Sequence, residues 1–356
     1  MSFFSNLLGL WGLDIGIDLG TSNIVVYVKG KGKGKGIVLN EPSMVALRKK
    51  PRGGGQEIIA VGREAKLMDG KTPAGVETVW PLQDGVIANF DMTEELLRYC
   101  IHEASEGKYN TRPRVAISVP AEITEVERKA VIDATLGAGA REAYVIEEPI
   151  SAALGVGLPI DEPRGSMIID IGGGTSEVSV ISLSGTSVKK SERIAGKNMD
   201  IAIINMLRQH FALLIGETTA EEVKNTIGTV LPLEEELTMQ VKGRDLSGGL
   251  PRIATISSVE VRESIEPIIS RIEDVIKFAL EQTKPELAKD IADHGIVLTG
   301  GVAQLRGLAE RLSCALNTPV FVAEEPLFSV ALGLGKYLDD LDGRKRMILT
   351  VQRGAR

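Results

Sequence analysis

The sequence predicts an α/β protein made of two related domains, and three features of the chain lead to this prediction. The chain has 356 residues, which is enough for two domains with full cores. Two glycine-rich hairpins of one design begin near residues 15 and 166. Each hairpin is followed by helical segments that alternate with short buried strands, the pattern of an α/β domain.

The hairpin at residues 166–181 has the clearest pattern. Apolar residues run up to Asp170, three glycines follow at 172–174, and beyond Thr175 the residues 177–181 form a β-rich run. This order predicts a strand, a tight turn and a second strand. Backbone N–H groups at such a turn can close on a phosphate because no Cβ intervenes, and Asp170 is placed to hold a hydrated Mg²⁺. Taken alone, the segment fits an ordinary glycine-rich hairpin equally well.

A second copy of this hairpin occupies residues 15–28. Ile17-Asp-Leu-Gly20 parallels Ile169-Asp-Ile-Gly172, and a Thr-Ser pair and a β-rich run follow in both. The two aspartates lie 152 residues apart (170 − 18), which is about one domain length. Repetition at this distance predicts two similar halves that face one ligand. We therefore expect a nucleotide held in a cleft between the halves.

Composition and charge exclude several classes of protein. Apolar residues make up 43% and charged residues 25% of the chain, as in a globular protein. The net charge of −7 argues against a nucleic-acid partner. No run approaches the roughly 20 apolar residues of a membrane-spanning helix, and no secretory signal is evident.

The first 13 residues carry large apolar side chains on one side of a helical wheel. Such a terminal helix fits the interface of a bilayer, although it could also dock on its own domain; we favour the membrane. The tract Lys29-Gly-Lys-Gly-Lys-Gly-Lys-Gly36 is expected to be a solvated loop, or to add attraction to anionic lipid if it lies on the same face. The predicted membrane-facing residues are Phe3, Phe4, Leu7, Leu8, Leu10 and Trp11.

Residues 14–150 are expected to form the first domain, with a small insert at about 37–83. Asp91 is a candidate N-cap, and Thr124 with Glu127 forms a capping box. The predicted elements are strands at 37–39, 43–47 and 58–61, helix 91–105, strand 115–119, helix 124–137, strand 143–147 and a helix from Pro149 to Gly155.

Residues 151–326 are expected to form the second domain, with an insert at about 190–257. Thr218 and Thr219 offer overlapping capping boxes, and Pro267 should break or kink a long helix. The predicted elements are the 166–181 hairpin, helices 196–216, 218–228 and 259–283, strand 295–299, helix 303–316, strand 320–323 and helix 329–341.

Several motifs resemble the actin/heat-shock chaperone/sugar kinase superfamily, and further motifs resemble its MreB family of bacterial actins. The resemblance runs from about residue 14 to the C-terminus. Three positions depart from the family pattern, namely Ser22, Ser176 and Val302, the last at the adenine edge of the expected pocket. The superfamily motifs are Ile17-Asp-Leu-Gly-Thr-Ser-Asn23, Ile146-Glu-Glu-Pro149, Asp170-Ile-Gly-Gly-Gly-Thr-Ser-Glu177 and Leu298-Thr-Gly-Gly301, and the MreB-like ones include Asn40-Glu-Pro-Ser43, Asp84-Gly-Val-Ile87, Arg193-Ile-Ala-Gly196 and Gly216-Glu-Thr-Thr-Ala-Glu221.

The resemblance implies an actin-like ATPase fold: two domains, each with a mixed sheet flanked by helices and a small insert, and residues 327–356 returning to the first domain. It implies ATP or ADP with Mg²⁺ in the interdomain cleft. Asp18 and Asp170 would hold the metal through water, while Glu148 and Thr175 position the attacking water. The nucleotide-binding residues it implies are Gly20, Thr21, Ser22, Asn23, Gly172, Gly173, Gly174, Glu221, Lys224, Gly300, Gly301 and Val302.

The function implied is that of a membrane-associated cytoskeletal ATPase. It would hydrolyse ATP slowly, assemble with itself into paired protofilaments, and organise cell-wall synthesis that maintains a rod shape. Its expected partners are anionic lipid on the inner face of the cell membrane and cell-wall elongation proteins. The alternatives are a plasmid or organelle filament protein and a soluble metabolite kinase, although the chain has no motif for a sugar pocket with an aspartate base. A chaperone ATPase is disfavoured because no substrate-binding domain follows.

Overall fold

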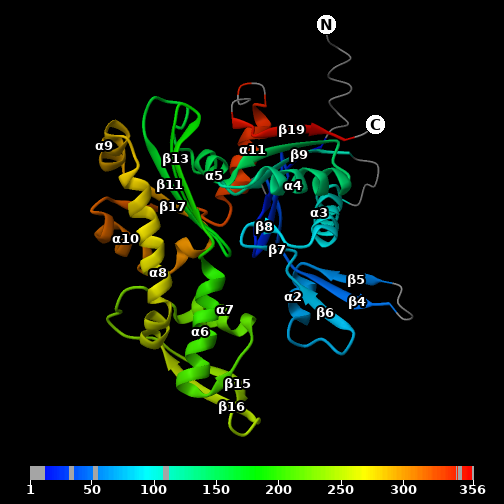
Figure 1. Ribbon diagram of the computed structural model, residues 1–356, viewed down its shortest axis with the longest axis vertical. Helices are drawn as coiled ribbons and strands as arrows, with labels where there is room; N and C mark the ends of the chain where they lie inside the picture. The colour runs from blue at the N-terminus through cyan, green and yellow to red at the C-terminus, as the bar shows by residue number, and fades with distance from the viewer. Residues whose placement is uncertain are drawn as a thin grey trace.

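The computed structural model describes residues 13–31, 36–50, 55–106, 112–341, 343 and 347–354, which form two α/β halves side by side (Figure 1). The predicted membrane-facing residues and part of the Lys-Gly tract lie outside the described residues. The first half contains a six-stranded sheet. In spatial order its strands are β19 (Thr350–Arg353), β10 (Glu142–Glu147), β9 (Arg114–Val119), β1 (Asp14–Leu19), β2 (Asn23–Val28) and β3 (Ile37–Pro42).

The second half contains a five-stranded sheet with the same connectivity. In the first half β1, β2 and β3 form an antiparallel meander, and β9 and β10 then run parallel to β1. In the second half β11, β12 and β13 form the same meander, and β17 and β18 run parallel to β11. This confirms the repeat predicted from the two hairpins. The hairpin strands that carry Asp18 and Asp170 are equivalent in the two sheets. In spatial order the strands are β13 (Gly185–Glu192), β12 (Ser176–Ser182), β11 (Ser166–Ile171), β17 (Ile296–Thr299) and β18 (Val320–Val322).

Each half also carries a small sheet at the lower end in Figure 1, and helices cover the large sheets. The small sheets are β5 (Gln56–Val61), β4 (Val45–Lys49) and β6 (Val76–Val79) in the first half, and β14 (Leu213–Leu214), β15 (Thr238–Asp245) and β16 (Pro251–Ser257) in the second, with a two-stranded pair β7 (Leu82–Gln83) and β8 (Val86–Ile87). The helices are α2 (Arg63–Met68), α3 (Phe90–Ala104), α4 (Glu125–Gly137), α5 (Glu148–Val156), α6 (Gly196–Phe211), α7 (Glu217–Ile227), α8 (Ser258–Glu281), α9 (Pro285–His294), α10 (Leu308–Leu316) and α11 (Ser329–Asp339), with a 3₁₀ turn η2 at Gly301–Gln304.

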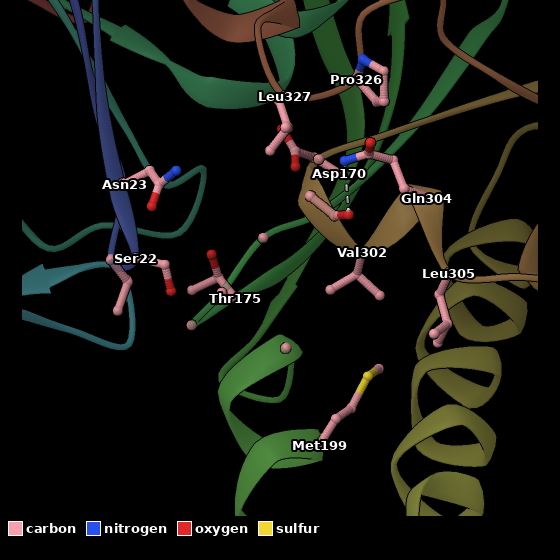
Figure 2. A pocket seen from close by; sticks show the side chains of 18 of the residues that line it. Ser22, Asn23, Asp170, Thr175, Met199, Val302, Gln304, Leu305, Pro326 and Leu327 are labelled. Atoms are coloured by element: carbon pink, nitrogen blue, oxygen red, sulfur yellow. Dashed lines mark hydrogen bonds between the residues drawn. The ribbon is translucent and has the colours of Figure 1, made fainter. Parts of the chain in front are cut away.

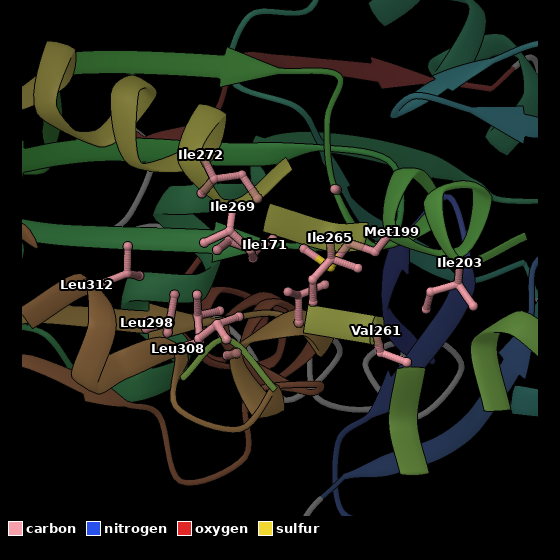
Figure 3. Packing of buried hydrophobic residues seen from close by; sticks show 14 of the residues in the cluster. Ile171, Met199, Ile203, Val261, Ile265, Ile269, Ile272, Leu298, Leu308 and Leu312 are labelled. Atoms are coloured by element: carbon pink, nitrogen blue, oxygen red, sulfur yellow. The ribbon is translucent and has the colours of Figure 1, made fainter. Parts of the chain in front are cut away.

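The core of the second half forms around α8 (Figure 3). Val261, Ile265, Ile269 and Ile272 recur every three or four residues, so they share one face of the helix, and all are buried. The predicted break at Pro267 is wrong, since α8 is one continuous helix through this residue. Pro267 lies on the exposed side, and the buried face continues on both sides of it.

Two helices join the halves at the top of Figure 1. The chain passes from the first half to the second through α5, and α11 packs directly against it. A Cβ built on Gly333 would lie 1.6 Å from the Ser151 carbonyl oxygen, and one on Gly155 would lie 1.8 Å from the Ser329 carbonyl oxygen. Only glycines therefore allow these two backbones to touch. Beyond α11 the chain adds β19 to the first sheet, beside β10.

Several local predictions need correction. β3 pairs with β2 in the large sheet, so this part of the expected insert at 37–83 is not in the small sheet. The N-cap of α3 is Asn89, whose side chain accepts from the Met92 N–H, whereas Asp91 lies within the first turn. α7 begins at Glu217 after Gly216, which places Thr218 and Thr219 inside the helix and rules out the predicted capping boxes there. The capping box of Thr124 and Glu127 is confirmed.

Candidate functional site

A cavity of about 570 Å³ lies between the two halves, where the tips of the two hairpins face each other. Every residue that the sequence assigned to phosphate, base, metal or hydrolysis lines this one cavity, while their roles remain predictions. From the first half come Asp18, Gly20, Thr21, Ser22, Asn23 and Glu148; from the second come Asp170, Gly172, Gly173, Gly174, Thr175, Glu221, Lys224, Gly300, Gly301 and Val302.

The two hairpin tips approach so closely that side chains on both would collide. A Cβ on Gly173 would lie 1.9 Å from the Ser22 Oγ, and one on Gly174 would lie 2.6 Å from the Thr21 Oγ1. The glycines of one half thus leave room for the hydroxyl side chains of the other. What remains between them is a cradle of backbone N–H groups and hydroxyls, the set of donors that binds phosphate oxygens.

Four buried carboxyl groups interact at or beside the cavity: Asp18, Asp170 and Glu148 line it, and Glu177 lies outside its lining. Burial raises the pKa of Asp18 to about 6, although the Ser118 hydroxyl, which donates to its Oδ1 at 3.0 Å, works in the opposite direction. Burial and the nearby Asp18 raise the pKa of Asp170 to about 7. Burial raises the pKa of Glu177 to about 8 and that of Glu148 well above its ordinary value, the latter also because the other three carboxylates lie close to it. So much acidic charge in one place favours a cation.

Asp18 and Asp170 fit a magnesium ion held partly by solvent. Among the residues described, no three acidic, histidine or cysteine side chains are grouped so that they could hold a metal by themselves. Mg²⁺ usually keeps several waters and takes its other ligands from one or two carboxylates and a phosphate. Gly300 allows this arrangement, because a Cβ on it would lie 2.4 Å from the Asp170 Oδ1.

We expect the thermal unfolding midpoint in EDTA to fall as the pH rises from 5 to 7.5. In this range the folded chain keeps protons on Asp18 and Asp170 that the unfolded chain has lost, because the pKa values of both groups are raised on folding. Their contribution to stability is thus complete below the ordinary aspartate pKa and is lost as the pH passes through 6 and 7.

Millimolar Mg²⁺ should flatten this dependence, since the cation replaces the protons. Scanning fluorimetry at several pH values, with and without Mg²⁺, measures both the pH dependence of the unfolding midpoint and the effect of Mg²⁺ on it. The double variant Asp18→Asn/Asp170→Asn should have a smaller slope, and the part that remains comes from the other buried carboxyls with raised pKa values, Glu148 and Glu177 among them. A midpoint that rises with pH in EDTA would contradict the expectation.

Glu148 and the adjacent Glu147 have different surroundings. Glu148 is the first residue of α5 and lines the cavity. Glu147 ends β10, and its carboxylate accepts from the Lys189 Nζ and the Thr186 Oγ1, both of the second half. Of these two residues, Glu148 is the one that lines the cavity, and its role towards a ligand remains a prediction.

Glu221 and Lys224 do not pair with each other as neighbours on α7. Glu221 lies 2.5 Å from the Lys66 Nζ on α2, so this ion pair crosses the mouth of the cleft. Lys224 pairs with Asp200 at 2.8 Å and donates to the Gly196 carbonyl at 3.1 Å. Both side chains are thus fixed by long-range partners, and both still line the cavity.

Apart from Val302, the sequence prediction missed the residues that form the apolar parts of the cavity. Figure 2 shows Met199, Val302 and Leu305 around one part of the pocket, with Leu327 and Pro326 at another part. A flat aromatic base fits between such apolar side chains. Met199 and Leu305 read in the sequence as core positions of helical segments, so no local pattern marked them as part of a site.

Two sheets of one connectivity that face each other across a glycine-lined cleft define the actin-like ATPase fold. The crystal structure of MreB5 of Spiroplasma citri bound to ADP matches with a TM-score of 0.86 at 35% identity, covering 94% of this chain and 98% of that one. The MamK double helical filament matches with a TM-score of 0.76 at 23% identity over 92% of this chain and 98% of that one, a likeness of fold alone.

The sequence comparisons identify the family. A family model described as MreB/Mbl protein matches residues 12–346. The chain is 47% identical over 335 residues to the cell shape-determining protein MreB of Escherichia coli (strain K12), covering 94% of this chain and 95% of the relative. It is 43% identical over 333 residues to the cell shape-determining protein Mbl of Bacillus subtilis (strain 168), covering 94% and 98%. The chain belongs to the MreB/Mbl family, and the prediction of a bacterial actin-like cell-shape protein is confirmed.

Proposed function

We propose that this protein binds and slowly hydrolyses ATP with Mg²⁺ and, in its ATP-bound form, assembles into membrane-bound filaments that organise cell-wall synthesis. The observation that carries the proposal is the meeting of the two hairpin tips over buried carboxylates, with Gly173 against Ser22 and Gly174 against Thr21. Relatives solved with ADP and with AMPPNP, the MreB5 structures of Spiroplasma citri, support the choice of nucleotide.

In this proposal each part of the cleft has one task. Thr21, Ser22 and Gly172 to Gly174 bind the phosphates, mainly through N–H groups, and Asn23 lies beside them. Met199 and Val302 contact the base, while Glu221 and Lys224 reach the ribose and the base edge. Asp18 and Asp170 hold magnesium through its waters, where it would offset phosphate charge.

The hydrolytic step needs a water in line with the γ-phosphate. Thr175 and Glu148 orient this water. Its oxygen forms a bond to the γ-phosphorus, while the bond from this phosphorus to the oxygen that bridges it to the β-phosphate breaks. The bridging oxygen keeps the electron pair and leaves with ADP, and the water's proton passes to the Glu148 carboxylate, whose raised pKa suits it to accept.

Membrane attachment is assigned to residues 1–13, of which 1–12 lie outside the described part of the chain. Within the described part, no helix is long and apolar enough to cross a bilayer. Phe3, Phe4 and Trp11 would instead insert their side chains at the interface of the inner membrane face. Filament assembly on that surface would place the protein near cell-wall elongation proteins.

We expect the purified protein with Mg-ATP to release phosphate and to sediment with anionic liposomes as filaments visible by electron microscopy. Deletion of residues 2–12, or the change Phe3→Ser/Phe4→Ser/Trp11→Ser, should abolish liposome binding and leave phosphate release intact. Neutral liposomes serve as the lipid control. Sedimentation that responds to neither nucleotide nor lipid would refute the proposal.

A further inference from the structure

Lys189 bridges the two halves next to the cleft and lies outside the cavity itself. It belongs to β13 of the second half. Its Nζ donates to the Glu147 Oε1 at 2.9 Å and to the Ala121 carbonyl oxygen at 2.7 Å. Glu147 ends β10 and Ala121 follows β9, so both acceptors belong to the first half. One ammonium group therefore holds the ends of two neighbouring strands.

The Glu147 carboxylate receives its side-chain hydrogen bonds from β13. The residue is only 5% exposed, so its carboxylate has little access to water. Lys189 binds one carboxylate oxygen, and the Thr186 hydroxyl donates to the other at 3.3 Å. A buried carboxylate without such partners is strongly unfavourable. The Glu147 side chain is consequently fixed to the second half, although its backbone belongs to the first.

The backbone of Glu147 in turn sets the place of Glu148. Glu147 pairs with Val119 as the last residue of β10 and is also the N-cap of α5, which begins at Glu148. The two glutamates share a peptide plane, so a displacement of one moves the other. Loss of the Lys189 contact would leave the Glu147 side chain free to turn towards solvent. The backbone at the start of α5 would then shift, and the Glu148 side chain would shift with it.

Residues 121 and 122 of the first half also contact β12 and β13 of the second half. The Ala121 N–H donates to the Glu177 Oε1 at 3.0 Å, while its carbonyl accepts from Lys189. Glu177 follows Thr175 by two residues on β12. Beside it, the Ser191 N–H donates to the Glu122 Oε2 at 3.1 Å. Residues 121 and 122 are thus held by two strands of the second half. The same segment is linked to Glu148 through Lys189 and Glu147, and to Thr175 through Glu177 on the same hairpin.

We propose that Lys189 is a positioning residue for ATP hydrolysis, which acts through Glu147 to hold Glu148 in line with the water that attacks the γ-phosphate. The inference rests on the proposed ATPase function. Lys189 contacts the first half from the second, so it transmits the relative position of the two halves to Glu148. Hydrolysis is then fastest when the two halves are placed as in this structure, where the Nζ reaches both acceptors.

The test compares Lys189→Met, Lys189→Arg and the matched control Lys190→Met in the full chain. Lys190 is next on the strand, and its 3.8 Å pair with Glu122 is partly exposed and therefore weak. Its variant removes an equal charge from β13 while Glu122 keeps its bond from the Ser191 N–H and Lys189 keeps its contacts with Glu147 and Ala121. For each protein we would measure affinity for a fluorescent ATP analogue, single-turnover phosphate release with saturating Mg-ATP, and sedimentation of filaments.

Lys189→Met should lower the rate of phosphate release about tenfold to 100-fold, as small displacements of catalytic groups do, with nucleotide affinity and sedimentation unchanged. Lys189→Arg should restore most of the rate, and Lys190→Met should match the wild type. An unchanged rate in Lys189→Met, or equal losses of rate and affinity, would overturn the inference while the wild type still hydrolyses ATP. A wild type that releases no phosphate would overturn the proposed function and the inference together.

Discussion

Replacement of Glu148 by Ala should lower single-turnover phosphate release by about 100-fold or more, the usual contribution of a positioned general base, while ATP still binds. Affinity for ATP should not fall, because Glu148 lies close to Asp18, Asp170 and Glu177 and its removal takes one negative charge from the phosphate site. Phosphate release and binding of a fluorescent ATP analogue, measured on the same preparation, separate the two effects.

Glu125→Ala is a matched control for this variant. Glu125 is the first residue of α4, as Glu148 is of α5, but its side chain is 82% exposed. If Glu148 served only to stabilise the N-terminus of its helix, both variants would lower the unfolding midpoint slightly and leave hydrolysis intact. Full activity in Glu148→Ala would transfer the water-positioning role to another residue, with Thr175 as the next candidate.

The cleft was predictable because its signals are local. Each hairpin carries its aspartate, its glycines and its hydroxyl residues within a few positions, and the repetition of this pattern placed the two on opposite sides of one ligand. The Ile146-Glu-Glu-Pro149 motif then located Glu148 by resemblance. Where the backbone must approach a phosphate closely, few residue types other than glycine fit. Such positions can therefore be recognised in a single sequence.

The contacts between the halves were not predictable in this way. Lys66 and Glu221 are 155 residues apart, and Lys189 and Glu147 are 42 apart, and no periodic pattern relates either pair. β13 was missed because its residues are mainly polar, as is common for an edge strand, whose charged side chains discourage pairing with other chains. Tertiary packing also decided the path of α8 through Pro267, against the local preference.

Replacement of Gly333 by Ala should have the largest effect on stability. Alanine normally favours a helix over glycine by about 1 kcal/mol, so the change alone would stabilise α11. Here the new Cβ would lie 1.6 Å from the Ser151 carbonyl oxygen, a backbone atom of α5, and 3.0 Å from the Gly155 nitrogen. Neither atom can rotate away, so the helices must separate. We expect the free energy of unfolding to fall by about 3 kcal/mol, as in severe overpacking.

Gly248→Ala is the control, because a Cβ there would meet nothing nearer than the Asp245 Oδ1 at 3.9 Å. Its unfolding midpoint should stay close to that of the wild type, whereas Gly333→Ala should unfold several degrees lower in scanning calorimetry. Since α5 carries Glu148 at its start, separation of α5 and α11 should also slow phosphate release in the folded fraction. An unfolding midpoint in Gly333→Ala equal to or above that of the wild type would mean that the two helices can move apart without loss, and that α5 and α11 do not fix the two halves to each other.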